Sequence, residues 1–96
     1  MTIEIELPEN KLQEAVKHLQ ESLDPNGTGP HEIDFGRGFK KWQLDDNNDW
    51  WAHLSPKGLR VSSRYHDESK LAYLGKRITL LMPEAKWNGT KSIKQG

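Results

Sequence analysis

The N-terminal part of the chain shows two hydrophobic periodicities in succession. Ile3, Ile5 and Leu7 alternate with polar residues, which predicts a half-buried β-strand. After Pro8, apolar residues at helical spacing predict an amphipathic helix, with its stripe at Leu12, Ala15, Val16, Leu19 and Leu23. Asn10, with Gln13 three residues later, resembles a capping box. The turn-forming run at 24–30 ends this helix.

Between residues 31 and 65 the hydrophobic period changes to two, and turn residues recur at short intervals. Alternating segments lie at 31–35, 39–44, 50–54 and 59–65, separated by glycine, proline or clustered aspartate and asparagine. Gly36 and Gly38 mark either a tight turn or a bulge after the first of these segments. Short strands joined in this way are typical of an antiparallel meander.

The last periodic segment carries a second helical stripe, which follows the good N-cap residue Asp67. The stripe consists of Leu71, Leu74, Ile78, Leu81 and Met82. Gly75 weakens the helix prediction, and residues 76–82 taken alone also fit a strand. We favour a helix because the apolar stripe continues across the glycine.

Together these elements predict one α+β domain over residues 1–87 and a flexible, basic C-terminal tail at 88–96. The domain is an antiparallel β-meander of about four to five strands, the N-terminal strand included, packed on two helices. Helices on one face of the sheet would bury both leucine stripes. The opposite face would then be exposed or bound to a partner.

Composition and charge change this picture in two respects. Hydrophobic residues make up 33% of the 96 residues and charged residues 29%, which predicts a folded domain with a thin core. The formal net charge of zero combines −6 in residues 1–34 with +6 in residues 35–96. The two parts either neutralise each other within the fold, or form oppositely charged faces that steer partners and favour a homodimer.

The sequence also bears on location. It contains no cysteine, so disulfides, thiol nucleophiles and cysteine-based metal sites are excluded. The chain has no apolar run of the roughly 20 residues that span a membrane, and two glutamates within Met1 to Leu7 do not fit a secretion signal. We therefore expect a cytoplasmic protein that does not bind membranes.

Bases and aromatic residues are interleaved in the meander. Trp50 and Trp51 are adjacent, so they face opposite sides of a strand. Trp50 shares its side with Ala52 and Leu54 and is predicted to be the buried one, whereas Trp51 shares its side with His53. The predicted partner-binding surface consists of Arg37, Lys41, Trp51, His53, Arg60 and Arg64.

This aromatic and cationic surface has several interpretations. Trp51 packed on arginine stems is the simplest. Tryptophan and arginine also anchor protein interfaces, and the same residues stack bases and contact phosphates. We favour a small non-catalytic binding or regulatory protein, an inhibitor or accessory subunit, that docks on another protein. Single-stranded nucleic-acid binding and a small-molecule-binding dimer are the alternatives.

Catalytic, cofactor and metal sites have little support in the sequence. The four histidines, at positions 18, 31, 53 and 66, lack the spacing of metal-ligand motifs. The aspartates at 45–49 are residues that a turn requires, and Gly36-Arg37-Gly38 lacks the Lys-Ser/Thr of a phosphate loop. We expect neither an enzyme nor a bound cofactor or metal.

Overall fold

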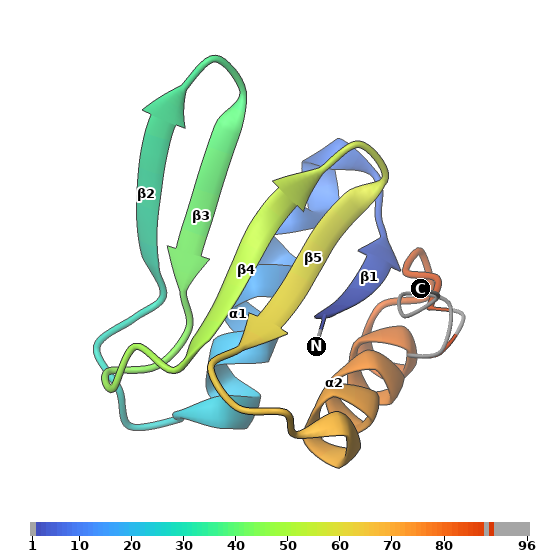
Figure 1. Cartoon of the computed structure of the whole chain (residues 1–96). Coiled ribbons are helices and arrows are strands. Elements are labelled where there is room, and N and C mark those ends of the chain that lie inside the picture. The colour runs from blue at the N-terminus through green and yellow to red at the C-terminus, as the bar shows by residue number, and fades with distance from the viewer. Residues whose placement is uncertain (1, 88, 90–96) are drawn as a thin grey trace.

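A computed structural model describes residues 2–87 and 89, which form a five-stranded antiparallel sheet and two α-helices (Figure 1). The elements in chain order are β1 (Thr2–Glu6), a 3₁₀ turn η1 (Glu9–Lys11), α1 (Leu12–Leu23), β2 (His31–Gly36), β3 (Phe39–Gln43), β4 (Trp50–Ser55), β5 (Gly58–Ser63) and α2 (Glu68–Leu81). The strand order is β1-β5-β4-β3-β2. This confirms the α+β prediction, including helix at 76–81. Apart from Gly89, the predicted tail at 88–96 lies outside the described residues.

One hydrophobic core lies between the sheet and the two helices. Ile3 and Ile5 of β1, Leu19 of α1 and Leu74 of α2 are all completely buried. Trp42 of β3 belongs to the same core. Because side chains alternate along a strand, burying this face leaves the other face of the sheet open. We call it the open face.

The start of α1 differs from the predicted capping box. No side chain caps this helix within the described residues, and the turn η1 leads directly into it. Gln13, the expected partner of Asn10, instead donates from Nε2 to Glu32 Oε1 of β2 at 3.0 Å. The start of α2 agrees with the prediction, since the backbone N–H of Lys70 donates to Asp67 Oδ1 at 3.0 Å.

Gly75, the residue that weakened the helix prediction, lies where Trp87 packs on α2. A Cβ atom at position 75 would be 2.5 Å from Cδ2 of the Trp87 indole, so a side chain there would displace the ring. The chain reaches this position after pairing with the edge of β1, where Glu6 and Lys86 exchange backbone hydrogen bonds of 2.8 and 3.0 Å. The glycine is therefore explained by tertiary packing, which overrides its poor helix propensity.

We predict that Leu74→Ala lowers the free energy of unfolding by about 2–5 kcal/mol, because it leaves a cavity in the core. Leu19→Ala should behave in the same way. Leu80→Ala is the matched control on the same helix, because the Leu80 side chain is 84% exposed; it should change stability by less than about 0.5 kcal/mol. Urea denaturation measures all three. Similar midpoints for Leu74→Ala and Leu80→Ala would contradict the assigned helix face.

The contact between Gly75 and Trp87 predicts that the effect of Gly75→Ala on the free energy of unfolding changes sign when the Trp87 ring is removed. In the parent protein Gly75→Ala should be destabilising, because the clash with the indole exceeds the gain of about 0.5–1 kcal/mol in helix propensity. In a Trp87→Ala background the same change should be stabilising. Chemical denaturation of the four proteins gives the result. An equal change in the free energy of unfolding in both backgrounds would show that the Trp87 ring is not the reason for a glycine at position 75.

Candidate partner-binding surface

The register of the sheet determines which side chains share the open face. One row crosses all five strands and consists of Ile33, Lys41, His53, Arg60 and Glu4. A second row consists of His31, Gln43, Trp51, Ser62 and Thr2. The buried residues Trp42 and Ala52 lie between the two rows and point to the helices. Both rows therefore face away from the core.

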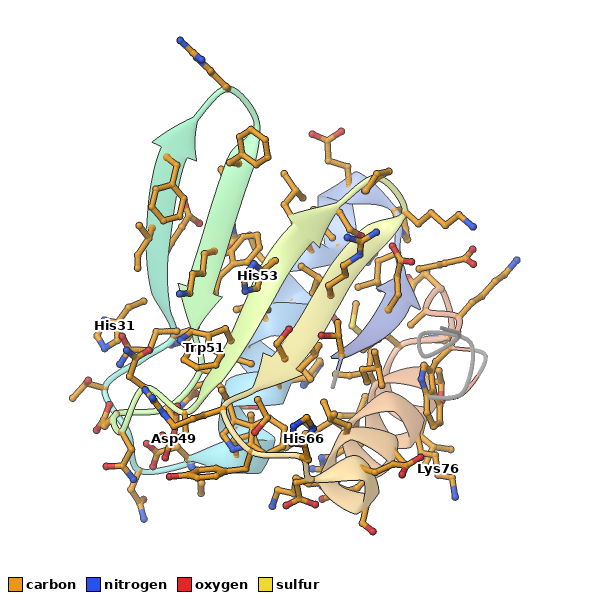
Figure 2. The ribbon with its side chains drawn as sticks, in the orientation of Figure 1. His31, Asp49, Trp51, His53, His66 and Lys76 are labelled. Carbon is orange, nitrogen blue, oxygen red and sulfur yellow. The ribbon has the colours of Figure 1, made fainter. Side chains whose placement is uncertain are left out.

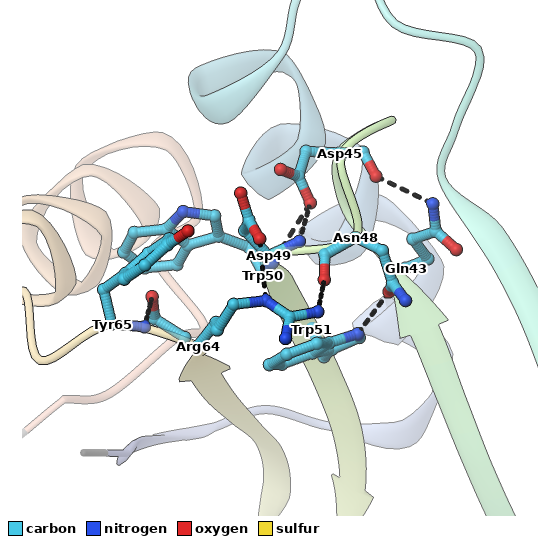
Figure 3. Close-up of polar contacts among 9 residues, drawn as sticks. Gln43, Asp45, Asn48, Asp49, Trp50, Trp51, Arg64 and Tyr65 are labelled. Carbon is cyan, nitrogen blue, oxygen red and sulfur yellow. Dashed lines mark hydrogen bonds and ion pairs between the residues drawn. The ribbon is translucent and has the colours of Figure 1, made fainter.

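Trp51 is held on the open face by two cations and a hydrogen bond, and Figure 3 shows Arg64 and the hydrogen bond. Lys41 Nζ lies 5.0 Å and Arg64 Cζ 5.7 Å from the centroid of the ring, within the range of cation–π contacts. The indole Nε1 donates to Asn48 Oδ1. Arg64 is itself fixed, because its Nε donates to Asp49 Oδ1 at 2.9 Å. Trp51 is thus a half-buried part of a network that orders the end of β4.

Trp50 lies on the opposite side of β4 and packs against the core, which agrees with its predicted direction. Its side chain is partly rather than fully buried. The Trp50 and Asp49 backbone N–H groups donate to Asp45 Oδ1 at 3.0 and 2.9 Å. The buried Asp45 carboxylate therefore holds the turn between β3 and β4, which is the structural role predicted for this acidic cluster.

His53 lies between two cations in its row (Figure 2). Burial lowers the pKa of His53 below its usual value, and the charges of Lys41 and Arg60 lower it further. Both effects favour the neutral form of the imidazole. Arg60 Nε lies 3.8 Å from Glu4 Oε2, and the same carboxylate oxygen accepts a hydrogen bond of 2.9 Å from Ser55 Oγ. Glu4 thus offsets the charge of Arg60, and Lys41 leaves this row with a net positive charge.

The structure adds three apolar residues that the sequence analysis did not assign to this surface. Phe35 and Phe39 are 65% and 66% exposed, and Ile33 is 40% exposed. They belong to the β2–β3 hairpin, which projects from the rest of the fold (Figure 1). A domain with a thin core gains stability by burying such side chains, so their exposure on one hairpin makes this hairpin a candidate interaction surface.

A hollow of about 660 Å³ lies on the open face beside this hairpin. Its lining consists of Thr2, Glu4, Phe39, His53, Leu54, Arg60 and Ser62. The hollow forms because β3 pairs with β4 from Lys41 to Gln43, while the first residues of β3 diverge from β4. It places the Phe39 side chain next to the polar groups of the His53 row, whereas the Leu54 side chain packs against the core on the other side of β4.

Five of the six predicted surface residues come together on or beside the open face, and Arg37 lies apart from them. Arg37 is in the turn that joins β2 to β3, with a φ of 57°, and the following Gly38 has a φ of 80°. These values suit the two-residue hairpin turn that favours glycine. The turn is at one end of β3, whereas Trp51 pairs with Gln43 at the other end.

The exposed hairpin residues could have been found from the sequence by counting from this turn. A tight turn at Gly36-Arg37-Gly38 places Ile33 close to opposite Lys41 on the neighbouring strand. If Trp42 is assigned to the core, Lys41 faces the open side, and its cross-strand partner Ile33 must face the same side. The position of the turn and the burial of Trp42 together therefore place Ile33 on the open face, and neither is sufficient alone.

Within the described ranges, no group of three or more His, Cys, Asp or Glu side chains could hold a metal ion. His31, His53 and His66 lie apart from one another (Figure 2). No helix in the described part of the chain is long and apolar enough to cross a membrane. Comparisons with family models, curated proteins and solved structures found no match to this chain.

The lowered pKa of His53 predicts that acid destabilises the parent more than a His53→Gln variant. The unfolded chain takes up the proton first as the pH falls through the usual histidine value of 6.5. The stability linked to His53 is thus present above this value and is lost as the pH falls toward the lower pKa of the folded state. Urea midpoints at about pH 7.5 and about pH 5 give the comparison. An equal fall of the urea midpoint between the two pH values in both proteins would contradict the prediction.

Proposed function

We propose that this chain is a small non-catalytic binding protein, an inhibitor or accessory subunit, that docks on another protein through the open face of its sheet. The observation that carries the proposal is the exposure of Phe35 and Phe39, at 65% and 66%, on a hairpin whose opposite end pairs with the strand of the half-buried Trp51. Removing apolar surface from water contributes about 25 cal/mol per Å². Aromatic side chains of this kind are the usual anchors of protein interfaces.

The electrostatics of the open face favour a protein over a single-stranded nucleic acid. Arg60 lies 3.8 Å from a carboxylate oxygen of Glu4, and Arg64 is bonded to Asp49 at 2.9 Å. Phosphate binding gains its free energy from cations that neutralise the backbone, and these two are already compensated within the fold. The Trp51 ring is also in contact with cations of its own chain, which reduces the area available for stacking on a base.

The hollow beside Phe39 supports the same proposal. It gives the open face a concave shape, so that a protruding apolar side chain of a partner could pack against Phe39. A partner with an apolar centre and a polar rim fits this surface. In keeping with a chain that has no cysteine, the proposal places the interaction in the cytoplasm.

We predict that the double variant Phe35→Ser/Phe39→Ser loses its protein partner while keeping its fold. Both rings are mostly exposed, so the folding cost should be less than about 1 kcal/mol, whereas anchors of this type contribute about 2 kcal/mol or more to binding. The tagged parent and variant are used for capture from a lysate of the source cells, and captured proteins are identified and quantified. Leu80→Ser, on the outer side of α2, is the matched exposed control.

The proposal is supported if one protein is captured by the parent and by Leu80→Ser, is lost with the hairpin variant, and survives nuclease treatment and moderate salt. It is overturned if capture by the hairpin variant equals that of the parent. Fluorescence anisotropy with labelled oligothymidylate tests the alternative, because salt-sensitive binding by the parent would favour nucleic acid. Light scattering of the purified chain tests the predicted homodimer in the same series.

A further inference from the structure

The direction of the backbone groups in β3 follows from one hydrogen bond. The N–H of Leu44, just after β3, donates to the carbonyl oxygen of Trp50 at 3.0 Å. In an antiparallel sheet, the N–H and C=O groups of successive residues point alternately to the two neighbouring strands. Leu44 bonds toward β4, so the backbone groups of Gln43 and Lys41 are directed toward β2.

The same alternation applies to β2, which is an edge strand of the sheet. His31 and Ile33 are the cross-strand partners of Gln43 and Lys41, so their backbone groups are directed toward β3. The N–H and C=O groups of Glu32 and Asp34 are therefore directed outward, away from the sheet. An edge of this kind can pair with another extended chain.

The side chains along this edge have opposite character on the two faces. Ile33 and Phe35 continue the exposed apolar surface of the hairpin. Glu32 and Asp34 lie on the side of the helices, where Glu32 accepts a hydrogen bond of 3.1 Å from Trp42 Nε1. Lys40 of β3 lies opposite Asp34 in the register, and its Nζ lies 3.8 Å from Glu32 Oε2, so a base already lies beside these acids within the sheet.

A second copy of the chain does not fit the edge. The two residues of β2 whose backbone groups are directed outward, Glu32 and Asp34, are both acidic. In an antiparallel pair of two such edges, every register that hydrogen-bonds these backbone groups to one another places Glu32 or Asp34 opposite an acid of the other copy. Like charges directly opposite one another destabilise a sheet. The acidic side of the edge thus works against self-pairing and selects a partner of the opposite charge.

We propose that the edge of β2 receives an extended segment of a partner protein in which basic and apolar residues alternate. The segment adds a sixth strand to the sheet. Its basic residues lie opposite Glu32 and Asp34, and its apolar residues extend the surface formed by Ile33 and Phe35. This inference rests on the proposed function, because the added strand and the open face would belong to one continuous interface.

The test uses a short acetylated peptide of alternating lysine and valine, at up to millimolar concentration, with the isotope-labelled full chain. Strand addition should slow amide hydrogen exchange of Glu32 and Asp34 by about tenfold or more, because these N–H groups become hydrogen-bonded. A peptide with glutamate in place of lysine should bind about tenfold more weakly. A lysine peptide that is N-methylated at alternate residues keeps its charge but loses backbone hydrogen-bond donors. This peptide should not bind, because strand addition needs these donors.

The variant Glu32→Gln/Asp34→Asn isolates the role of charge. Glutamine keeps an acceptor for the Trp42 indole, and asparagine keeps one for the Gly36 N–H, which donates to Asp34 Oδ1 at 2.8 Å. The hairpin should therefore be retained, while the preference for the lysine peptide over the glutamate peptide falls to less than about threefold. An unchanged preference would overturn the assigned charge selection.

Two results separate this inference from the proposed function. If Phe35→Ser/Phe39→Ser abolishes capture of the partner but the peptide leaves the exchange of Glu32 and Asp34 unchanged, strand addition is overturned and the open face remains the binding surface. If the peptide protects these amides but the hairpin variant still captures the partner, the proposed open-face function is overturned. Equal binding of the N-methylated peptide also overturns strand addition.

Discussion

The burial of Trp42 is the constraint on which the rest of this surface depends. Side chains alternate between the two faces of a strand, so placing this indole in the core turns Lys41 and Phe39 to the open face. The register with β2 then carries Ile33 to the same side. A shift of one residue would bury the cation and expose the largest side chain of the core, so the register is strongly determined.

The base of the β2–β3 hairpin is tied to the helix layer through Glu32. Its carboxylate accepts hydrogen bonds from Gln13 Nε2 and Trp42 Nε1, at 3.0 and 3.1 Å, and these bonds lower the pKa of Glu32. Beyond this point β3 diverges from β4, and Phe35 and Phe39 are exposed. The hairpin is thus anchored at one end and presents its apolar residues at the other.

Local periodicity was sufficient to predict both helices, the meander, the Asp67 cap and the opposite directions of Trp50 and Trp51, because each depends on neighbouring residues. It could not assign Ile33 and Phe35, since an apolar and acidic alternation fits a buried face as well as an open one. That choice depends on pairing with a second strand. The Gly75 position likewise depends on Trp87, which is distant in sequence and contacts the helix only after the chain has returned past β1.

The unequal charges of the two parts of the sequence meet inside the fold. Glu4 lies 3.8 Å from Arg60, Glu32 lies 3.8 Å from Lys40, and Lys11 lies 3.4 Å from Glu84, so each pair joins an N-terminal residue to a later one. Exposed pairs of this kind contribute only about 0–1 kcal/mol each. The pair between Lys11 and Glu84 joins a base of the acidic part to an acid of the basic part, so most of the −6 and +6 is not offset by these contacts, and the homodimer stays a prediction. The apolar hairpin and its acidic edge remain as the features on which the proposed binding of a different protein rests.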